Sequence, residues 1–170
     1  MVFDNPLKPT LDNPTICQDA MRIILASARA VQKAQLLDVA DGVSNPKPRL
    51  VTLSTTGISS TRDLPCLMKP MYHWMLKVPH DDKHVMETLI KGEMAKPLAD
   101  RGIDNFVIVR PSLLTDGKGD GLHKIKAGTA ENPAVGYVIC RNDVGAWLFE
   151  NLVRGFYGET YVGQIVTITA

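Results

Sequence analysis

The stretch from Arg49 to Gly57 reads RLVTLSTTG and joins a short apolar run to a small polar loop. An almost continuous apolar run of this length is typical of a parallel strand that is covered on both faces. Ser54, Thr55 and Thr56 then stand at the carboxyl end of the predicted strand, which is the usual ligand position in open α/β sheets. The stretch therefore predicts an α/β fold with a candidate site where this strand ends.

The rest of the chain alternates further strands with amphipathic helices. Predicted strands cover residues 49–54, 106–110, 136–140 and 164–169, and predicted helices cover residues 12–33 and 80–91 and a segment that starts at 142. Asx residues precede two of these helices, at Asn13 and at Asn142-Asp143, and are expected to cap them. Residues 61–79 are expected to be loop with short helical pieces, and the glycine-rich residues 115–130 a mobile loop. This order predicts a mostly parallel sheet with helices on both faces.

Composition places the chain among ordinary globular proteins. Its 170 residues suit one domain over residues 1–170, and its net charge of +1 gives no sign of a nucleic-acid or membrane partner. Cys17, Cys66 and Cys140 are far apart and odd in number, so we expect buried thiols rather than disulfides or a zinc site. The start lacks the pattern of a secretory signal, and the prediction is a cytoplasmic protein.

The sequence ahead of Arg49 lacks a feature of nucleotide-binding domains. No strand there runs into a glycine-rich turn and a helix, the arrangement that holds a dinucleotide pyrophosphate on backbone N–H groups. The stretch from Gly117 to Gly121 is not expected to replace it, because it follows the wrong strand and carries an aspartate. We therefore expect the substrate side of such a domain, with the first βαβ half absent.

Four short motifs follow one another along the chain: Ser54-Thr55-Thr56-Gly57, the segment 82–87, the segment 106–111, and Asp143-Val144-Gly145. In this order they resemble the atypical short-chain dehydrogenase/reductase family, in its NAD(P)-binding branch that is NmrA-like or biliverdin-reductase-B-like. The early Asp-Asn-Pro segment is most similar to fungal members. The resemblance implies an incomplete Rossmann-like three-layer sandwich, reductase chemistry on a small-molecule substrate, and NADP or NAD as cofactor.

The resemblance also implies roles for particular residues. Ser54 and Thr55 stand where the family's hydroxyl orients the substrate carbonyl, and Lys83 matches the helix lysine that contacts the nicotinamide ribose. Arg110-Pro111-Ser112 matches the segment that passes under the nicotinamide carboxamide. Thr55, Arg110, Pro111 and Ser112 are therefore the expected cofactor contacts.

The chain departs from the family at the catalytic tyrosine. Members of the classical type carry a tyrosine one helical turn before the lysine, and here that place holds Pro79. Tyr72 lies upstream and is the candidate replacement as proton donor. Ser54, Tyr72 and Lys83 are therefore the expected catalytic residues.

Each candidate also has a structural interpretation. The Ser54 to Thr56 hydroxyls can serve turn chemistry, Tyr72 can pack over Trp74, and Lys83 can be a solvated helix lysine. His80 and His84 are one turn apart and could share a metal, or they could mark a solvated helix start. We predict no metal site.

Three functions remain open from the sequence. The chain is a reductase-like protein that needs a further part to hold its cofactor, or a cofactor-independent isomerase, cyclase or dehydratase, or a non-catalytic regulatory module like some NmrA-like proteins. In each case the strand at residues 49–54 is expected to have an exposed edge. Because exposed edges invite pairing, we expect a homo-oligomer through this edge, or a rearranged N-terminal segment that covers it.

Overall fold

A computed structural model describes residues 12–38, 46–154 and 159–170. Its α-helices are α1 (Ile16–Asp38), α2 (Lys69–Met75), α3 (Lys77–Met94) and α4 (Arg141–Leu148), which the π-helix η4 (Phe149–Val153) continues. Its strands are β1 (Leu50–Leu53), β2 (Phe106–Pro111), β3 (Leu113–Thr115), β4 (Lys126–Thr129), β5 (Val138–Cys140) and β6 (Gln164–Thr169). Short 3₁₀ turns are η1 (Cys66–Met68), η2 (Leu98–Asp100) and η3 (Leu122–Lys124).

The main sheet has four strands in the order β1-β2-β6-β4. β1, β2 and β6 are parallel, whereas β4 runs antiparallel to β6. β3 and β5 form a separate parallel pair. The expectation of a mixed α/β fold with a mostly parallel sheet is confirmed.

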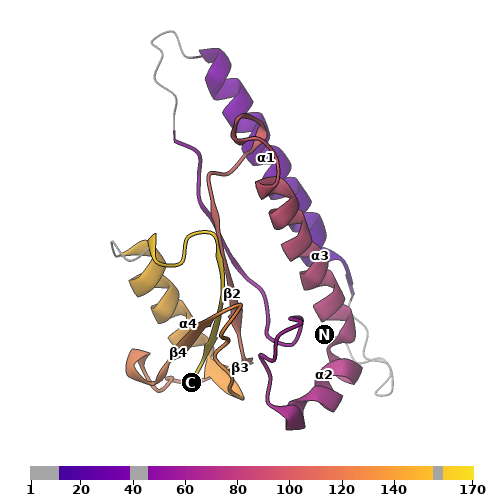
Figure 1. Cartoon of the computed structure of the whole chain (residues 1–170), viewed down its shortest axis with the longest axis vertical. Helices are drawn as coiled ribbons and strands as arrows, with labels where there is room; N and C mark the ends of the chain where they lie inside the picture. Colours follow the sequence, from indigo (N-terminus) through magenta and orange to yellow (C-terminus); the bar gives the residue numbers. More distant parts are fainter. Residues whose placement is uncertain (1–11, 39–45, 155–158) are drawn as a thin grey trace.

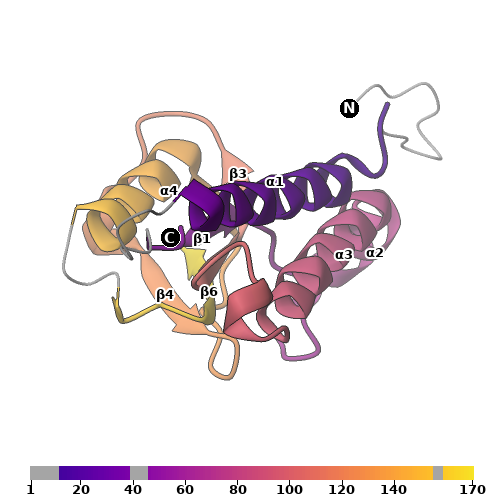
Figure 2. The same ribbon diagram turned by 90° about the horizontal axis from the view of Figure 1, so that it is seen from above.

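Helices cover both faces of the main sheet. The pair α1 and α3 lies on one side of the strands and α4 lies on the other (Figures 1 and 2). On the first face Met21, Met86 and Ile90 pack with Ile108 of β2. On the second face Val144 and Trp147 of α4 belong to a cluster that includes other β2 and β6 side chains. The structure is therefore layered helix, sheet and helix.

The apolar runs behave differently at the centre and at the edge of the sheet. All six residues of β2 are buried, as expected of a strand between two neighbours with helices on both faces. β1 is the terminal strand, and its burial alternates, with Val51 43% and Leu53 39% exposed. The expectation that β1 is covered on both faces is therefore wrong, because α4 reaches β2 and β6 and leaves this side of β1 open.

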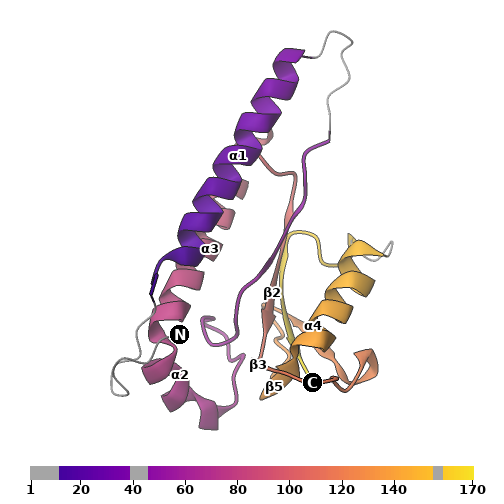
Figure 3. The ribbon, with the colours of Figure 1, turned by 180° about the vertical axis from the view of Figure 1, so that it is seen from behind.

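The long helix α1 begins at Ile16, a few residues after the predicted start, and ends at Asp38, five residues after the predicted end. The Asn13 carboxamide accepts the Thr15 N–H at 3.0 Å. The Asp82 carboxylate of α3 accepts the Cys17 and Gln18 N–H groups, both at 2.9 Å. Helix N-termini carry N–H groups without intrahelical partners, so Asp82 completes the start of α1 from a second helix. Figure 3 shows the two helices side by side along most of their length.

Segments that were expected to be loop contain more regular structure. Residues 61–79 hold η1, α2 and the first turn of α3, and Pro70 and Pro79 lie in first turns, where proline is tolerated. The stretch 115–130 holds the end of β3, η3 and β4, so its expectation as plain loop is wrong. β4 is a short edge strand that pairs with β6. Its sequence has no apolar pattern that predicts this pairing.

The start of α4 and the cysteines also need correction. The residue before α4 is Cys140, so Asn142 and Asp143 lie in the first turn and do not cap it. All three cysteines are free thiols, but only Cys140 is buried, whereas Cys17 is half-buried and Cys66 is exposed. Among the described helices none is long and apolar enough to cross a membrane.

Candidate functional site

The loop after β1 is fixed to the end of β2 by its backbone. The Ser54 N–H donates to the Val109 carbonyl at 2.7 Å, and the Thr56 N–H donates to the Pro111 carbonyl at 3.2 Å. Both side chains are buried. The Ser54 hydroxyl has no hydrogen-bond partner within the part of the chain that the structure describes. A buried hydroxyl without a partner is costly, and it is a candidate for contact with a ligand.

Lys83 reaches the same strand end from α3. Its Nζ donates to the Leu53 carbonyl at 3.0 Å. Lys83 and Leu53 also line an open groove of about 470 Å³ between α1 and β1. The structure therefore brings the predicted residues Ser54 and Lys83 to one place, the carboxyl end of β1.

Tyr72 lies away from Lys83, on the short helix α2. Its side chain is buried, and its ring centroid is 5.3 Å from that of His80. Burial raises the pKa of the Tyr72 hydroxyl, a hydrogen bond with the Thr56 side chain opposes the shift, and the charge of Asp63 adds to it. Tyr72 lines hollows with Gly57 and His80, whereas Lys83 lines the groove beside β1. Trp74 is 56% exposed and is not the ring on which Tyr72 packs.

Gly57 makes this close packing possible. Its φ of +90° lies in the left-handed region. A Cβ atom at this position would lie 2.7 Å from Leu64 Cδ1 and 2.8 Å from Tyr72 Cδ1. Glycine is therefore required here both by the backbone conformation and by the lack of space.

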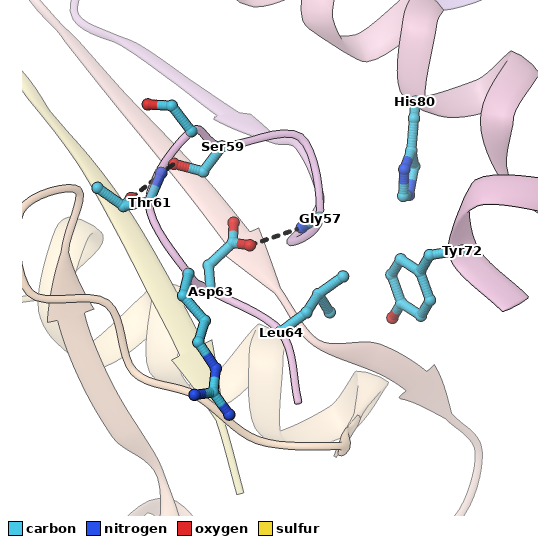
Figure 4. Close-up of a pocket in the computed structure, with 9 residues that line it drawn as sticks. Gly57, Ser59, Thr61, Asp63, Leu64, Tyr72 and His80 are labelled. Atoms are coloured by element: carbon cyan, nitrogen blue, oxygen red, sulfur yellow. Dashed lines mark hydrogen bonds between the residues drawn. The ribbon is translucent and has the colours of Figure 1, made fainter. Parts of the chain in front are cut away.

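A hollow of about 230 Å³ opens beside Gly57. It is lined by Gly57, Ser59, Ser60, Thr61, Arg62, Asp63, Leu64, Tyr72 and His80. We call it the Asp63 hollow. Figure 4 shows Asp63 between Gly57 and the hydroxyl residues Ser59 and Thr61, with Tyr72 and His80 beyond Gly57. The hollow is thus bounded by the loop after β1 and by residues of α2 and α3.

Asp63 is the buried acid of this hollow. Its Oδ1 accepts the Gly57 N–H at 3.1 Å, and its side chain is only 3% exposed. Burial raises the pKa of Asp63, while the Gly57 hydrogen bond and the Arg110 charge oppose this shift in part. Sequence analysis missed Asp63, because a lone aspartate between Arg62 and Leu64 in a loop has no distinguishing pattern.

Arg110 forms a buried ion pair with Glu87 of α3. The guanidinium donates to Glu87 through Nε at 2.9 Å and through Nη2 at 2.6 Å, and both side chains are buried. The carboxylate of a second acid, Asp63, is farther away, with its Oδ2 3.9 Å from Arg110 Nη1. The pair therefore ties the end of β2 to α3 beneath the loop. Glu87 was quoted within the helix motif, but its partner could not be read from the sequence.

The other expected cofactor contacts also make bonds inside the protein. The Ser112 and Thr169 hydroxyls are 2.9 Å apart, and the Pro111 carbonyl accepts the Thr56 N–H. The Thr55 hydroxyl donates to the neighbouring Thr56 carbonyl at 3.1 Å and is only partly buried. Of this group, Thr55 has the most accessible side chain.

The glycine-rich loop after β3 is closed around an acid. Asp143 Oδ2 accepts the Asp120 N–H at 2.8 Å, and Oδ1 accepts the Gly121 N–H at 3.1 Å. A Cβ atom on Gly119 would lie 2.3 Å from Asp143 Oδ1. The Asp120 and Gly121 N–H groups are thus paired with a carboxylate of the protein and are not open to a phosphate.

The histidines considered for a metal lie in other surroundings. His80 packs on Tyr72, His84 is exposed, and the two acids between them bond elsewhere, Asp81 to Lys77 and Asp82 to the start of α1. The side chain of His73 is outside the described residues. Within residues 12–38, 46–154 and 159–170, no three histidine, cysteine, aspartate or glutamate side chains are grouped so that they could hold a metal ion.

Comparison with curated proteins finds relatives with redox names. The chain is 54% identical to the protein named Reductase pytE of Aspergillus terreus, over 99% of this chain and 63% of that protein. It is 37% identical to Oxidase pynE of Aspergillus niger, over 93% of this chain and 58% of that protein. The chain therefore spans about three fifths of these relatives. No family model matches it.

Solved structures identify the fold. A short-chain dehydrogenase/reductase from Veillonella parvula superposes on 98% of this chain with a TM-score of 0.57 and 10% identity. A second structure of a short-chain dehydrogenase/reductase from the same organism, in complex with NADP, gives a TM-score of 0.55 and 11% identity over 99% of the chain. At this low identity the likeness concerns the fold alone, which matches the Rossmann-like fold of these short-chain dehydrogenase/reductases.

Proposed function

We propose that this chain is the substrate-side part of a nicotinamide-dependent reductase of the NmrA-like or biliverdin-reductase-B-like type, acting on a small organic metabolite. The observation that carries the proposal is the buried Ser54 hydroxyl, without a partner among the described residues, beside the strand end that Lys83 contacts. The fold and the reductase name of a 54% identical relative support it.

The proposed chemistry follows from the groups at this strand end. The Ser54 O–H can donate to a substrate carbonyl oxygen, and a donor fixed in a buried position stabilises negative charge that develops on that oxygen. The Lys83 ammonium adds positive charge close by. A tyrosine hydroxyl is protonated at neutral pH, and burial raises the pKa of Tyr72 further, so we keep Tyr72 as the candidate proton donor.

The described residues do not fit a whole dinucleotide. Arg110 and Ser112 are buried and bonded to Glu87 and Thr169, so only Thr55 and Lys83 offer accessible polar atoms to a nicotinamide ribose. In the glycine-rich loop the Asp120 and Gly121 N–H groups are paired with Asp143. The proposal therefore assigns the phosphates of NAD(P) to groups outside the described residues.

The edge of β1 is the proposed docking place for those groups. β1 is the terminal strand, and the groove beside it exposes apolar atoms of Ile24, Val51 and Leu53. Exposed edges of this kind pair readily with another strand. The alternative occupant is a second copy of the chain, and sedimentation of the chain alone distinguishes a dimer from a monomer.

The test uses the chain alone and a fusion to the part of Reductase pytE that it does not span. Calorimetric titration with NADPH should give a dissociation constant weaker than about 1 mM for the chain alone, and tighter binding for the fusion. Micromolar binding by the chain alone would contradict the assignment of the phosphates.

Activity of the fusion is then measured by NADPH oxidation with a panel of small ketones and aldehydes. Ser54→Ala should lower kcat/KM by about 100-fold, as expected for one donor to a developing oxyanion. Ser27→Ala on the exposed side of α1 is the matched control. Equal rates for the Ser54 and Ser27 variants would refute the role of Ser54.

A second candidate is a cofactor-independent isomerase, cyclase or dehydratase. It is favoured by the close grouping of Tyr72, His80 and Asp63 around one hollow. It requires product to form without nicotinamide and to be lost in Tyr72→Phe.

A further inference from the structure

The Asp63 hollow is separate from the groove that Lys83 lines. Its walls come from the loop after β1 and from Tyr72 and His80, whereas the groove is lined mainly by α1, β1 and α3. Of the residues proposed above for reductase chemistry, Tyr72 lines it, whereas Ser54 and Lys83 do not. The hollow therefore needs an explanation of its own.

One atom at this hollow has unused hydrogen-bonding capacity. Asp63 Oδ2 is buried and accepts no hydrogen bond within the described residues, although Oδ1 accepts the Gly57 N–H. A buried carboxylate oxygen without a donor costs roughly 1–3 kcal/mol or more. The structure tolerates this cost at a position that faces a cavity.

Arg110 does not remove the cost. Its Nε and Nη2 are committed to Glu87 at 2.9 and 2.6 Å, and its Nη1 is 3.9 Å from Asp63 Oδ2, beyond hydrogen-bond reach. Two carboxylates thus share one guanidinium. The unpaired Oδ2 acceptor favours a ligand that brings a hydrogen-bond donor rather than another acceptor.

The remaining walls limit the ligand further. The Ser59 and Thr61 hydroxyls bond to each other at 2.7 Å, and Thr61 also bonds to the Ala130 carbonyl. Leu64 and the Tyr72 ring supply apolar surface. At about 230 Å³ the space is smaller than the roughly 300–1,000 Å³ of ordinary ligand pockets, so it suits one ring or one arm of a molecule.

We propose that the Asp63 hollow binds a neutral hydroxyl or amide N–H group of a small organic molecule, which donates to Asp63 Oδ2 while its apolar part lies against Leu64 and Tyr72. The proposal goes beyond reductase function and holds for any chemistry at Ser54. Its test needs no nicotinamide, so its failure is distinct from failure of the reductase proposal.

The experiment compares two probes that differ in one donor. Benzyl alcohol carries an O–H group, whereas benzyl methyl ether has the same ring and only an acceptor. Titration into the ¹⁵N-labelled chain should shift the amide signals of Gly57 and Asp63, with affinity for the alcohol about tenfold higher. This ratio is expected for a hydrogen bond to a charged acceptor. Equal affinity for the two probes would overturn the proposal.

Asp63→Asn tests the acceptor directly. Its carboxamide oxygen can keep the Gly57 bond, and its NH₂ group then replaces Oδ2, so the preference for the alcohol should fall to about onefold. Asp104→Asn changes an exposed aspartate in the same way and should keep the wild-type ratio. An unchanged ratio in the Asp63 variant would also overturn the proposal.

A measurement on the wild-type chain tests the proposal even if the Asp63 variant does not fold. Intermolecular nuclear Overhauser effects should connect the benzyl alcohol ring to the Leu64 methyl groups and the Tyr72 ring. Effects confined to Met21 and Ile24 would place the probe in the β1 groove and contradict the assignment.

Discussion

Two loops at the ends of strands wrap around buried aspartates and use them differently. The loop after β3 gives the N–H groups of Asp120 and Gly121 to Asp143, so both carboxylate oxygens are paired. The loop after β1 gives the Gly57 N–H to Asp63, which lines a hollow, and among the described residues Oδ2 accepts no hydrogen bond. The first loop is closed by its acid, whereas the second keeps an acceptor available.

Both loops also depend on a glycine at positive φ. Gly119 has a φ of +79°, and a Cβ there would meet the Asp143 carboxylate. Gly57 has a φ of +90°, and a Cβ there would meet Leu64 and Tyr72, side chains that line the hollow. The same backbone device therefore serves a structural loop in one case and a cavity wall in the other.

The largest expected effect concerns the support beneath the open loop. Glu87→Ala leaves the buried Arg110 guanidinium without its main partner, and removal of one member of a buried pair destabilises by about 3–5 kcal/mol. Urea unfolding measures the change. Glu150→Ala, which removes an exposed pair with Arg154, should cost less than about 1 kcal/mol. A small effect at Glu87 would mean that the open loop needs no such support.

An intermediate effect is expected at the closed loop. Asp143→Asn retains one acceptor and turns an NH₂ group toward a backbone N–H, so it should destabilise the protein by about 2 kcal/mol. Hydrogen exchange of the Asp120 and Gly121 amides should accelerate. Asp116→Asn, an exposed acid in the same loop region, is the control. Unchanged exchange in the Asp143 variant would remove the distinction between the two loops.

The smallest effect is expected at Asp63. Asp63→Asn keeps the Gly57 bond and relieves a buried charge, so its free energy of unfolding at pH 7 should stay within about 1 kcal/mol of wild type or exceed it. Burial raises the pKa of Asp63 above the unfolded value of 3.8, so the folded state binds the proton more tightly. The wild type therefore loses stability relative to the variant as pH rises from 3.8 through the folded pKa.

Urea unfolding of both proteins between pH 3 and pH 7 measures this difference. A wild type that gains stability relative to Asp63→Asn as pH rises would show that Oδ2 is well paired in the folded protein. In that case both loops would hold an aspartate whose two carboxylate oxygens are paired, and the distinction between them would be lost.

Much of the fold could be predicted because its signals are local. The apolar runs of β1, β2 and β6 appear where the sequence indicates them, and α1 begins within a few residues of the predicted start at Asn13. The prediction was wrong where a tertiary neighbour decides the outcome. β4 is a polar strand that forms only through pairing with β6, and β1 is half exposed because it ends the sheet.

The candidate site was predictable in part for the same reason. The position of Ser54 at a strand end follows from the strand itself, and Lys83 reaches that end because α3 packs on the same face. Arg110 was expected to face a cofactor, yet its guanidinium bonds to Glu87, 23 residues earlier in the chain. The roles of Ser54, Tyr72 and Lys83 in catalysis stay predictions.

The sequence by itself determined the apolar strands β1, β2, β5 and β6, the amphipathic helices and the polar loop from Ser54 to Gly57, because apolar periodicity and turn residues act over short distances. Only the tertiary structure decided which polar atoms have hydrogen-bond partners within the protein and which are left without one. Asp143 meets its loop across 22 and 23 residues, and Arg110 meets Glu87 across the sheet–helix interface. A hydrogen bond needs two groups within about 3 Å of each other, and chain folding alone sets such distances between remote residues.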